Sequence, residues 1–354
     1  MSDSVDARSV ARRATPYNDV PMNDPLDPGT PNFSSLTPEL VLDALDAVGI
    51  RGDGRLLALN SYENRVYQVG RDDAPTLVAK FYRPARWSDA QILEEHGFVN
   101  SLVEQELPVV PATALVDGAT LHAFKGFRFA VFEKHGGRAP ELEHPGTLEW
   151  LGRFIGRIHA IGAVQPFTVR PTLDIASFGD ASRDYLMQHD FLPPELRSAY
   201  FSVLAQALDG VRRCFDRTGS FDAIRLHGDC HIGNVLWTDA GPHFVDFDDS
   251  RMGPAIQDLW MLLSGERADQ VRQLADLLAG YEDFQDFDAR QLHLVEGLRT
   301  LRLMHYSAWL ARRWDDPAFK LAFPWFDSQR YWQDRILELR EQVALMDEPP
   351  LWAS

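Results

Sequence analysis

The chain has 354 residues, of which 45% are hydrophobic and 25% charged, a balance typical of globular proteins. No apolar run reaches the ~18 residues of a membrane helix, and residues 1–6 lack the apolar segment of a secretory signal. The two cysteines, Cys214 and Cys230, give no disulfide framework, so we expect a cytoplasmic protein without a membrane partner. The formal charge is −17 and no large basic cluster occurs, which argues against nucleic-acid binding. The acidity indicates a solubilising surface or, alternatively, a cationic substrate.

The first third of the chain predicts a small antiparallel sheet. Residues 1–35 are rich in Asp, Pro, Ser and Asn, and are expected to form a flexible leader. Thr37 is a good helix cap before Pro38, and the helix should end at Gly49. Segments 56–59 and 66–69 predict a hairpin, and 76–82 a third strand with Lys80 on one face. A helix over about 88–106 and strands at 121–123 and 127–133 complete this part.

The rest of the chain is mostly helical in pattern. Apolar periodicity predicts helices around 150–161 and at about 194–216, 267–282, 288–314 and 328–346. We therefore expect an α+β, two-lobed protein-kinase-like fold. Its predicted parts are a flexible leader (1–35), a sheet-rich N-lobe with one helix (36–134) and a larger helical C-lobe that carries the catalytic loop (135–354).

The most specific pattern is His227-Gly228-Asp229-Cys230-His231-Ile232-Gly233-Asn234, followed by Asp246-Phe247-Asp248. In phosphoryl transfer one carboxylate receives the proton of the attacking hydroxyl, and other oxygens hold Mg²⁺ on the nucleotide phosphates. We assign Asp229 the catalytic role, Asn234 a metal role, and Asp246 both a catalytic and a metal role. Asp248 and Asp249 are candidates for a second ion. The structural alternative, in which Asp229 caps a helix and Asn234 closes a turn, does not explain Asp246 at this spacing.

Lys80 stands in the middle of an apolar strand, where an amine is costly unless it is paired. A phosphate and a carboxylate would compensate it, and the following helix offers Glu94 or Glu95. We favour Glu95, because Phe98, Val99 and Leu102 follow at helical spacing and would seat that face on the sheet. The alternative is that Lys80 lies at a strand edge with its amine in water.

Three further positions carry weaker predictions. Ser61 lies in a glycine-free turn, 60–64, where a loop covering the nucleotide is expected. Glu133 lies in the segment 132–134 that we expect beside the adenine of ATP. His227 is predicted to brace the catalytic loop. Asp258 is either an ordinary acid at a helix start or a residue that holds the loop in shape.

These motifs resemble those of the aminoglycoside phosphotransferase and choline kinase group, and within it those of the bacterial stress response kinases. The stretches that carry the resemblance are Leu59-Asn60-Ser61-Tyr62-Glu63-Asn64, Lys80-Phe81-Tyr82-Arg83-Pro84, Gln91-Ile92-Leu93-Glu94-Glu95-His96, Leu226-His227-Gly228-Asp229-Cys230-His231 and Gln257-Asp258-Leu259-Trp260. The resemblance spans roughly residues 35–352. It implies a monomeric, cytoplasmic stress-response enzyme that uses ATP and Mg²⁺ to phosphorylate serine or threonine in proteins. It also implies that Asp229 and Asp246 are active-site acids, Asn234 a metal ligand and Ser61 a residue of the ATP site.

Two departures from ordinary protein kinases leave the acceptor open. Asp248 stands where the third motif residue is usually glycine, and eight residues, 250–257, separate Asp249 from Asp258, too few for a phosphorylatable activation segment. A small alcohol or amino-alcohol kinase of the same fold is therefore the alternative. A nucleotide-sensing module without turnover is a third hypothesis, which the complete set of Lys80, Asp229, Asn234 and Asp246 disfavours.

Overall fold

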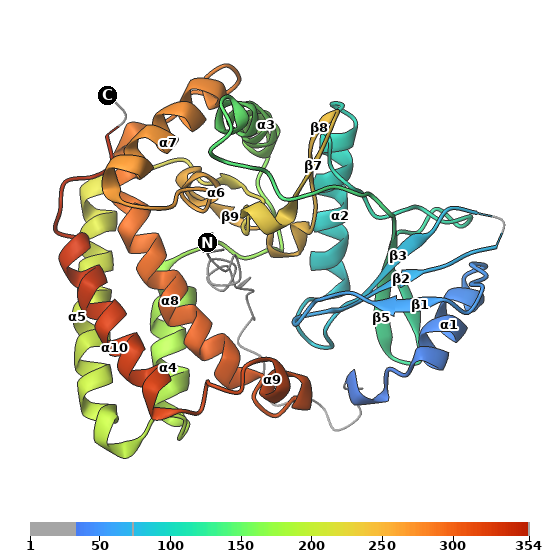
Figure 1. The fold of residues 1–354 in the computed structure, drawn as a ribbon, viewed down its shortest axis with the longest axis horizontal. Coiled ribbons are helices and arrows are strands. Elements are labelled where there is room, and N and C mark those ends of the chain that lie inside the picture. The colour runs from blue at the N-terminus through green and yellow to red at the C-terminus, as the bar shows by residue number, and fades with distance from the viewer. Residues whose placement is uncertain (1–32, 73, 353–354) are drawn as a thin grey trace, which may run out of the picture.

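The computed structural model describes residues 33–72 and 74–352. Figure 1 shows a sheet with α1 at one end of the molecule, a larger group of helices at the other, and α2 standing between them. The predicted α+β, two-lobed kinase-like fold is confirmed. Most of the predicted leader, residues 1–32, lies outside the described residues. Phe33–Ser35 form a short 3₁₀ helix, and the Phe33 ring stacks on Phe127 with centroids 6.3 Å apart, so the described structure begins before the predicted boundary.

The sheet is antiparallel in the order β1-β2-β3-β5-β4. Its strands are β1 (Leu56–Ala58), β2 (Arg65–Val69), β3 (Leu77–Phe81), β4 (His122–Phe124) and β5 (Phe127–Glu133). Leu77, Ala79 and Phe81 are buried against α1 (Pro38–Ala47), as the alternation of β3 predicts. Lys80 therefore points to the opposite face, the one that α2 approaches. Thr37 caps α1 by accepting a hydrogen bond from the Leu40 N–H at 3.3 Å, as expected.

Helix α2 (Asp89–Val103) belongs to both parts of the molecule. Ser88 begins it with a capping box to Gln91. Ile92 packs with residues of the sheet, whereas Phe98 packs in the main core of the helical lobe, 6.1 Å from the Phe247 ring. The prediction that residues 98–102 seat on the sheet was wrong, because helical periodicity defines an apolar face but not the element it meets.

The helical lobe is built on eight α-helices in the described part of the chain. In addition to α3 (Thr147–Gly162), they are α4 (Ala181–Gln188), α5 (Pro194–Thr218), α6 (Ile256–Trp260), α7 (Arg267–Tyr281), α8 (Val295–Arg312), α9 (Pro317–Ala322) and α10 (Gln329–Leu345). The predicted helix 288–314 is divided into a 3₁₀ turn (Ala289–Leu294) and α8. None of the described helices is both long and apolar enough to cross a bilayer. The predicted lobe boundary at 134/135 falls between β5 and α3 and stays a prediction.

Two short strand pairs hold the loops of the site. β6 (Ile224–Arg225) pairs with β9 (Met252–Gly253), and β7 (Val235–Thr238) pairs with β8 (Gly241–Phe244). The loop with Asp229 therefore begins at one pair, and Asn234 and Asp246 flank the other.

Candidate active site

The shape of the loop between β6 and β7 depends on a glycine and on a buried carboxylate. Gly228 has φ +86°, and a Cβ at this position would lie 2.1 Å from the Asp249 carbonyl oxygen, so a larger residue does not fit. The Asp258 carboxylate accepts hydrogen bonds from the backbone N–H groups of His227 at 2.8 Å and Gly228 at 2.9 Å. His159 is 3.0 Å from the same carboxylate. Of the two roles left open for Asp258, the structure thus supports the one that holds the loop.

His227 links this loop to the strand that precedes Asp246. Its Nε2 atom lies 3.0 Å from the Val245 carbonyl oxygen, and its Nδ1 atom is 3.3 Å from the Asp229 backbone nitrogen. These contacts agree with the predicted bracing role.

Asp229 is 2% exposed, and three side chains surround its carboxylate. Arg302 of α8 donates to Oδ1 at 2.9 Å, His231 lies 3.3 Å from Oδ2, and the Asn234 amide nitrogen lies 3.4 Å from Oδ2. Burial alone would raise the pKa of Asp229, but Arg302 and His231 outweigh it and hold this pKa well below its usual range. The carboxylate is therefore ionised at neutral pH and is better suited to orient a hydroxyl than to keep its proton.

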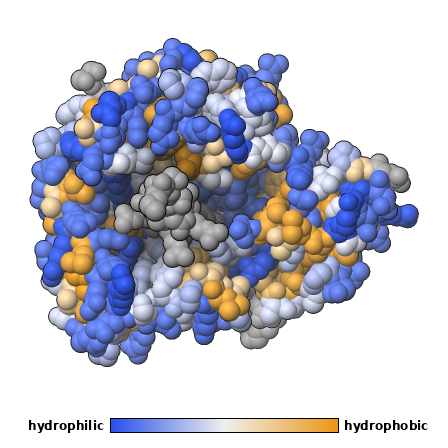
Figure 2. Space-filling model, viewed as in Figure 1, coloured by the Kyte–Doolittle hydropathy of each residue, from blue (hydrophilic) through white to orange (hydrophobic). Residues whose placement is uncertain are grey.

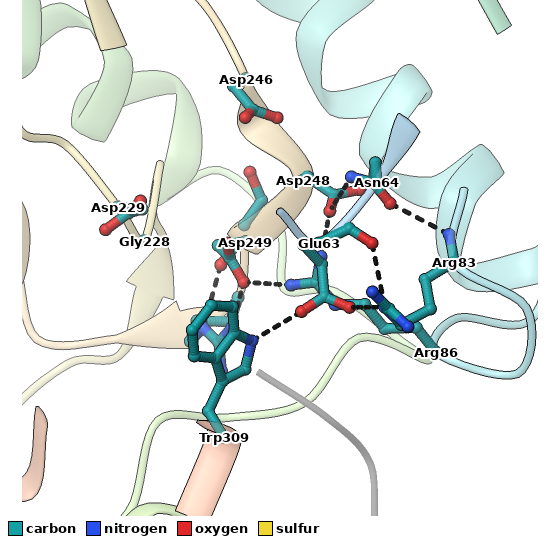
Figure 3. A network of polar contacts seen from close by, with 12 residues as sticks. Glu63, Asn64, Arg83, Arg86, Gly228, Asp229, Asp246, Asp248, Asp249 and Trp309 are labelled. Carbon is teal, nitrogen blue, oxygen red and sulfur yellow. Dashed lines mark hydrogen bonds and ion pairs between the residues drawn. The ribbon is translucent and has the colours of Figure 1, made fainter. Parts of the chain in front are cut away.

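Asn234 and Asp246 are brought together by the β7–β8 hairpin. The Val245 N–H donates to the Asn234 carbonyl oxygen at 3.0 Å. Because Val245 directly precedes Asp246, this hydrogen bond holds the backbones of Asn234 and Asp246 close together. Asp246 has φ 62° and ψ 63°, a left-handed backbone that is strained for a residue with a side chain. Its side chain is 47% exposed, in contrast to the buried Asp229. Figure 3 shows Asp229 and Asp246 on separate segments of the chain.

The donor set fits Mg²⁺, which prefers hard oxygen ligands and keeps several waters. The Asn234 amide nitrogen donates to the Asp229 carbonyl oxygen at 3.0 Å, so the amide oxygen is the atom that could serve as a ligand. Asp246 adds a charged oxygen that solvent and phosphate can reach.

Lys80 makes its ion pairs with the two aspartates of the 246–248 motif. Its Nζ atom lies 2.7 Å from Asp246 Oδ1 and 3.4 Å from Asp248 Oδ1. Burial acts to lower the pKa of Lys80, but Asp246, Asp248 and Glu95 outweigh it and raise this pKa above its usual value. The alternative of an amine in water at a strand edge is wrong, since Lys80 is 7% exposed.

The two candidate partners of Lys80 from α2 differ in position. Glu94 accepts backbone hydrogen bonds from Thr168, Val169 and Arg170, so it faces away from the site. Glu95 is 4% exposed, and burial raises its pKa to about 7 even though Arg170 and Lys80 oppose the shift. The predicted ion pair between Lys80 and Glu95 does not form, because two carboxylates of the 246–248 motif reach the amine instead. A role for Glu95 at the nucleotide site stays a prediction.

Asp248 and Asp249, the candidates for a second ion, are both paired with an arginine. Arg86, which follows β3, binds both carboxylates, with Nη1 on Asp248 and Nη2 at 2.6 Å from Asp249 Oδ1. Asn64 donates to Asp248 Oδ2 at 2.9 Å (Figure 3). A role for these two acids at a second ion stays a prediction, and it would require both buried carboxylates to exchange their guanidinium partner for a metal.

The turn at 60–64 is anchored to the helical lobe. Glu63 is 2% exposed and lies 2.6 Å from Arg313 Nη2. It also lies 2.8 Å from Arg83 Nε and accepts a hydrogen bond from Trp309 at 2.6 Å (Figure 3). Ser61 is half-buried in this turn, and its contact with a nucleotide stays a prediction.

The Lys80 face of the sheet carries an apolar row. Leu57, Val78 and Phe132 lie in register through Gln68, and Leu57 is 58% exposed. Figure 2 shows hydrophobic residues on the sheet side of a hollow between the two lobes. Such a row suits the flat ring of a nucleobase. Glu133 ends β5 beside it with a side chain 83% exposed, so only its backbone is well placed, and its predicted role stays open.

Sequence reasoning missed two arginines of the site. Arg86 had a weak local signal, since Arg83 and Arg86 both follow closely on the apolar strand that carries Lys80. Arg302 had none, because a single arginine on a long helix is ordinary.

Comparison with known proteins agrees with this geometry. Residues 55–295 match the model of the phosphotransferase enzyme family, and the chain belongs to this family and is an ATP-dependent phosphotransferase. It is 46% identical to stress response kinase A of Salmonella choleraesuis (strain SC-B67) over 319 residues, which cover 90% of this chain and 96% of the relative. It has the same identity and coverage with the serine/threonine protein kinase RdoA of Salmonella typhimurium, and 44% identity with stress response kinase A of Escherichia coli (strain K12). The resemblance to stress response kinases is confirmed.

Solved structures share the fold at lower identity. An amicoumacin kinase, hAmiN, in complex with AMP-PNP and Ca²⁺, has a TM-score of 0.65 at 18% identity, covering 84% of this chain and 90% of its own. A microcompartment-associated aminopropanol kinase has a TM-score of 0.63 at 18% identity, covering 83% and 91%. These similarities support the two-lobed kinase fold.

Proposed function

We propose that this phosphotransferase is a monomeric, cytoplasmic stress-response enzyme that transfers the γ-phosphoryl group of ATP to serine or threonine hydroxyls of proteins. Two printed contacts support the chemistry: Lys80 lies 2.7 Å from Asp246, and the Asn234 amide nitrogen lies 3.4 Å from the Asp229 carboxylate. The hydrogen bond from the Val245 N–H to the Asn234 carbonyl oxygen connects the two pairs. The name of the relative from Salmonella typhimurium, at 46% identity, supports a protein acceptor.

Each residue has a distinct task in the proposed reaction. Lys80 holds phosphate oxygens, and the row of Leu57, Val78 and Phe132 receives the base. Asn234 and Asp246 would hold Mg²⁺, which when bound neutralises charge on the phosphates. Asp229 accepts a hydrogen bond from the acceptor hydroxyl and orients its oxygen. The oxygen forms a bond to the γ-phosphorus, the bond from that phosphorus to the β–γ bridging oxygen breaks, and ADP leaves. The hydroxyl proton passes through Asp229 to water.

The second candidate is a kinase of small alcohols or amino-alcohols. The short segment 250–257 favours it, because it leaves no long activation segment to bind a polypeptide.

The test is phosphorylation of a generic protein substrate, compared with a panel of small alcohols, using ATP and Mg²⁺. The Asp229→Ala variant should lower turnover by roughly a hundredfold or more and leave nucleotide binding nearly intact. Wild-type-like turnover by this variant would exclude Asp229 from the mechanism, and phosphorylation of alcohols alone would replace the protein acceptor.

A further inference from the structure

A cavity of about 270 Å³ lies in the helical lobe, where the end of α7 meets β6 and the start of α6. Its lining includes Tyr281 at the end of α7, Ile224 of β6 and Ala255 directly before α6. None of the four residues assigned to phosphoryl transfer lines it, so it is separate from the candidate active site. A space of this size admits a small organic molecule and not only a water.

The inner wall of this cavity is apolar and carries one buried amide. Phe221 adds a second aromatic ring to that of Tyr281. Gln291 also lines the cavity and is 5% exposed, and its amide oxygen accepts a hydrogen bond from the Ile256 N–H at 3.2 Å. Its amide nitrogen therefore points away from Ile256, and it makes no hydrogen bond to a residue of the described chain. A buried donor of this kind suits an acceptor atom of a bound molecule.

The rim of the cavity is acidic. Asp222, Asp286 and Asp288 line it, against a single guanidinium, that of Arg290. Arg290 is bound to Asp288 at 2.8 Å. Asp222 and Asp286 are exposed and form no ion pair with a described residue, although Asp222 adds to the charge around Arg290. The rim therefore carries an excess of negative charge, which favours a cationic ligand.

These carboxylates suit an organic cation better than a metal ion. In the part of the chain that the structure describes, no three acidic, histidine or cysteine side chains converge closely enough to hold a metal. Acidic groups spread around the mouth of an apolar cavity fit an ammonium group attached to an apolar body. The rings of Phe221 and Tyr281 can contact either part of such a molecule.

Two chains of hydrogen bonds lead from the cavity wall to the catalytic loop. In the first, the Tyr281 hydroxyl lies 3.0 Å from His159 Nδ1, and His159 Nε2 lies 3.0 Å from the Asp258 carboxylate. Asp258 in turn accepts the backbone N–H groups of His227 and Gly228. The ring that lines the cavity is therefore two side chains away from the loop that carries the catalytic aspartate.

The second chain runs through the short helix α6. Gln291 binds the N–H of Ile256, the first residue of this helix. The next residue, Gln257, donates from its amide nitrogen to the Gly228 carbonyl oxygen at 3.3 Å. A molecule that fixes Gln291 and Tyr281 would thus act on both supports of the loop.

We propose that this cavity is a second ligand site, which takes a small organic ammonium ion with an apolar body, and that a ligand bound there stabilises the catalytic loop. The ammonium group lies at the acidic rim, and an acceptor atom of the body meets the Gln291 amide. Local opening of the loop disturbs both chains of hydrogen bonds. A molecule that binds the intact arrangement therefore lowers the population of opened ones.

The first experiment compares three probes of similar shape and different charge. They are tyramine, 4-ethylphenol and 3-(4-hydroxyphenyl)propionate, which are cationic, neutral and anionic. Ligand-observed NMR with the full chain, without ATP, gives their Kd values. Tyramine should bind with a Kd of roughly 1 mM, as expected for so small a molecule, and about tenfold more tightly than the propionate. Equal or weaker binding of tyramine, or no binding of any probe up to roughly 20 mM, would overturn the proposal.

A pair of charge variants locates the binding. Asp222→Asn combined with Asp286→Asn should weaken tyramine binding by roughly tenfold and leave 4-ethylphenol nearly unaffected. The matched control combines Asp190→Asn with Asp209→Asn, which are 103% and 68% exposed and do not line the cavity. Unchanged tyramine binding in the first double variant, or an equal loss in the control, would show that the acidic rim is not the site.

Hydrogen exchange measures the link to the loop. With saturating tyramine, the amides of residues 224–234 should exchange at least about twofold more slowly, while those of α2 stay unchanged as an internal control. The double variant at the rim should lose this protection at the same tyramine concentration. Binding without protection of 224–234 would refute the link. Neither ATP nor an acceptor is present, so these results are independent of which hydroxyl the enzyme phosphorylates.

Discussion

Asp246 combines a strained backbone with an exposed side chain, and the strained backbone conformation directs that side chain toward Lys80. The left-handed conformation (φ 62°) turns its carboxylate toward Lys80 instead of continuing β8. The neighbouring Asp248 and Asp249 are buried and bound to Arg86. Of these three aspartates, Asp246 is the one with a largely exposed side chain.

Asp246→Ala should therefore abolish Mg²⁺-dependent ATP binding, because the charged oxygen ligand is removed. Calorimetric titration of ATP, with Mg²⁺ and with a chelator, measures the effect. Asp239→Ala is the matched control, since Asp239 lies exposed in the turn of the same hairpin. A titration of Asp246→Ala that equals the wild type would remove its ligand role.

Glu95 should make the stability of the protein fall as pH rises. Burial raises its pKa to about 7 in the folded state, and the unfolded value is about 4.3. Its contribution is fully present below the unfolded pKa and is lost as pH rises through the folded pKa. Glu95→Gln should then gain ~2–3 kcal/mol of unfolding free energy over wild type between pH 5 and pH 8. Urea unfolding at the two pH values measures this gain, and an equal effect at both would show an unshifted carboxyl.

At the scale of elements, the helical lobe depends on the close approach of α3 and α7. A Cβ on Gly280 would lie 1.9 Å from the Glu149 carbonyl oxygen, and one on Gly152 would lie 2.0 Å from the Leu277 carbonyl oxygen. Backbone faces backbone at both points, so neither contact can be relieved by a side-chain rotation. The glycines thus set the distance between the two helices.

Gly280→Ala should destabilise the protein by ~2–3 kcal/mol or more, because the helices must separate to admit the methyl group. Gly97→Ala is the control in α2, where a Cβ would have no atom within 4 Å. It should be neutral or stabilising by up to ~1 kcal/mol through helix propensity. Chemical denaturation of both variants measures the difference, and equal effects would mean that the α3–α7 contact yields easily.

At the scale of the molecule, buried ion pairs join the sheet to the helices. Glu63 from the β1–β2 turn binds Arg313 of the helical lobe, and Arg86 from the segment after β3 binds Asp248 and Asp249. Helix α2 adds an apolar connection through Phe98 and Phe247. The position of the 60–64 turn relative to the 246–248 motif is thereby defined by ion pairs between the two lobes.

Arg86→Met should cost ~3–5 kcal/mol, because Asp248 and Asp249 stay buried and each loses its nearest cationic partner. A double-mutant cycle with Asp249→Asn should show a coupling of at least ~1 kcal/mol. Arg330→Met is the control for an exposed pair, as Arg330 is 89% exposed beside Asp334, and it should change stability by under ~0.5 kcal/mol. Additive effects in the cycle would mean that the two lobes do not depend on this contact.

The amino-acid sequence by itself determined the elements and the chemical groups. The alternation of β3, the cap at Thr37 and the helical periodicity of α5, α7 and α10 are short-range patterns, so they are legible without a structure. Asp229, Asn234 and Asp246 likewise belong to one hairpin and the loop before it, so their spacing is also a short-range pattern.

Only the tertiary structure decided which charged groups meet. Arg86 and Asp248 are 162 positions apart, and Arg302 and Asp229 are 73 apart. For the same reason, Lys80 pairs with Asp246 and not with Glu95, and residues 98–102 pack in the helical lobe and not on the sheet. A local pattern gives a residue its direction on an element, but its partner depends on how distant elements pack, which no short stretch of chain specifies.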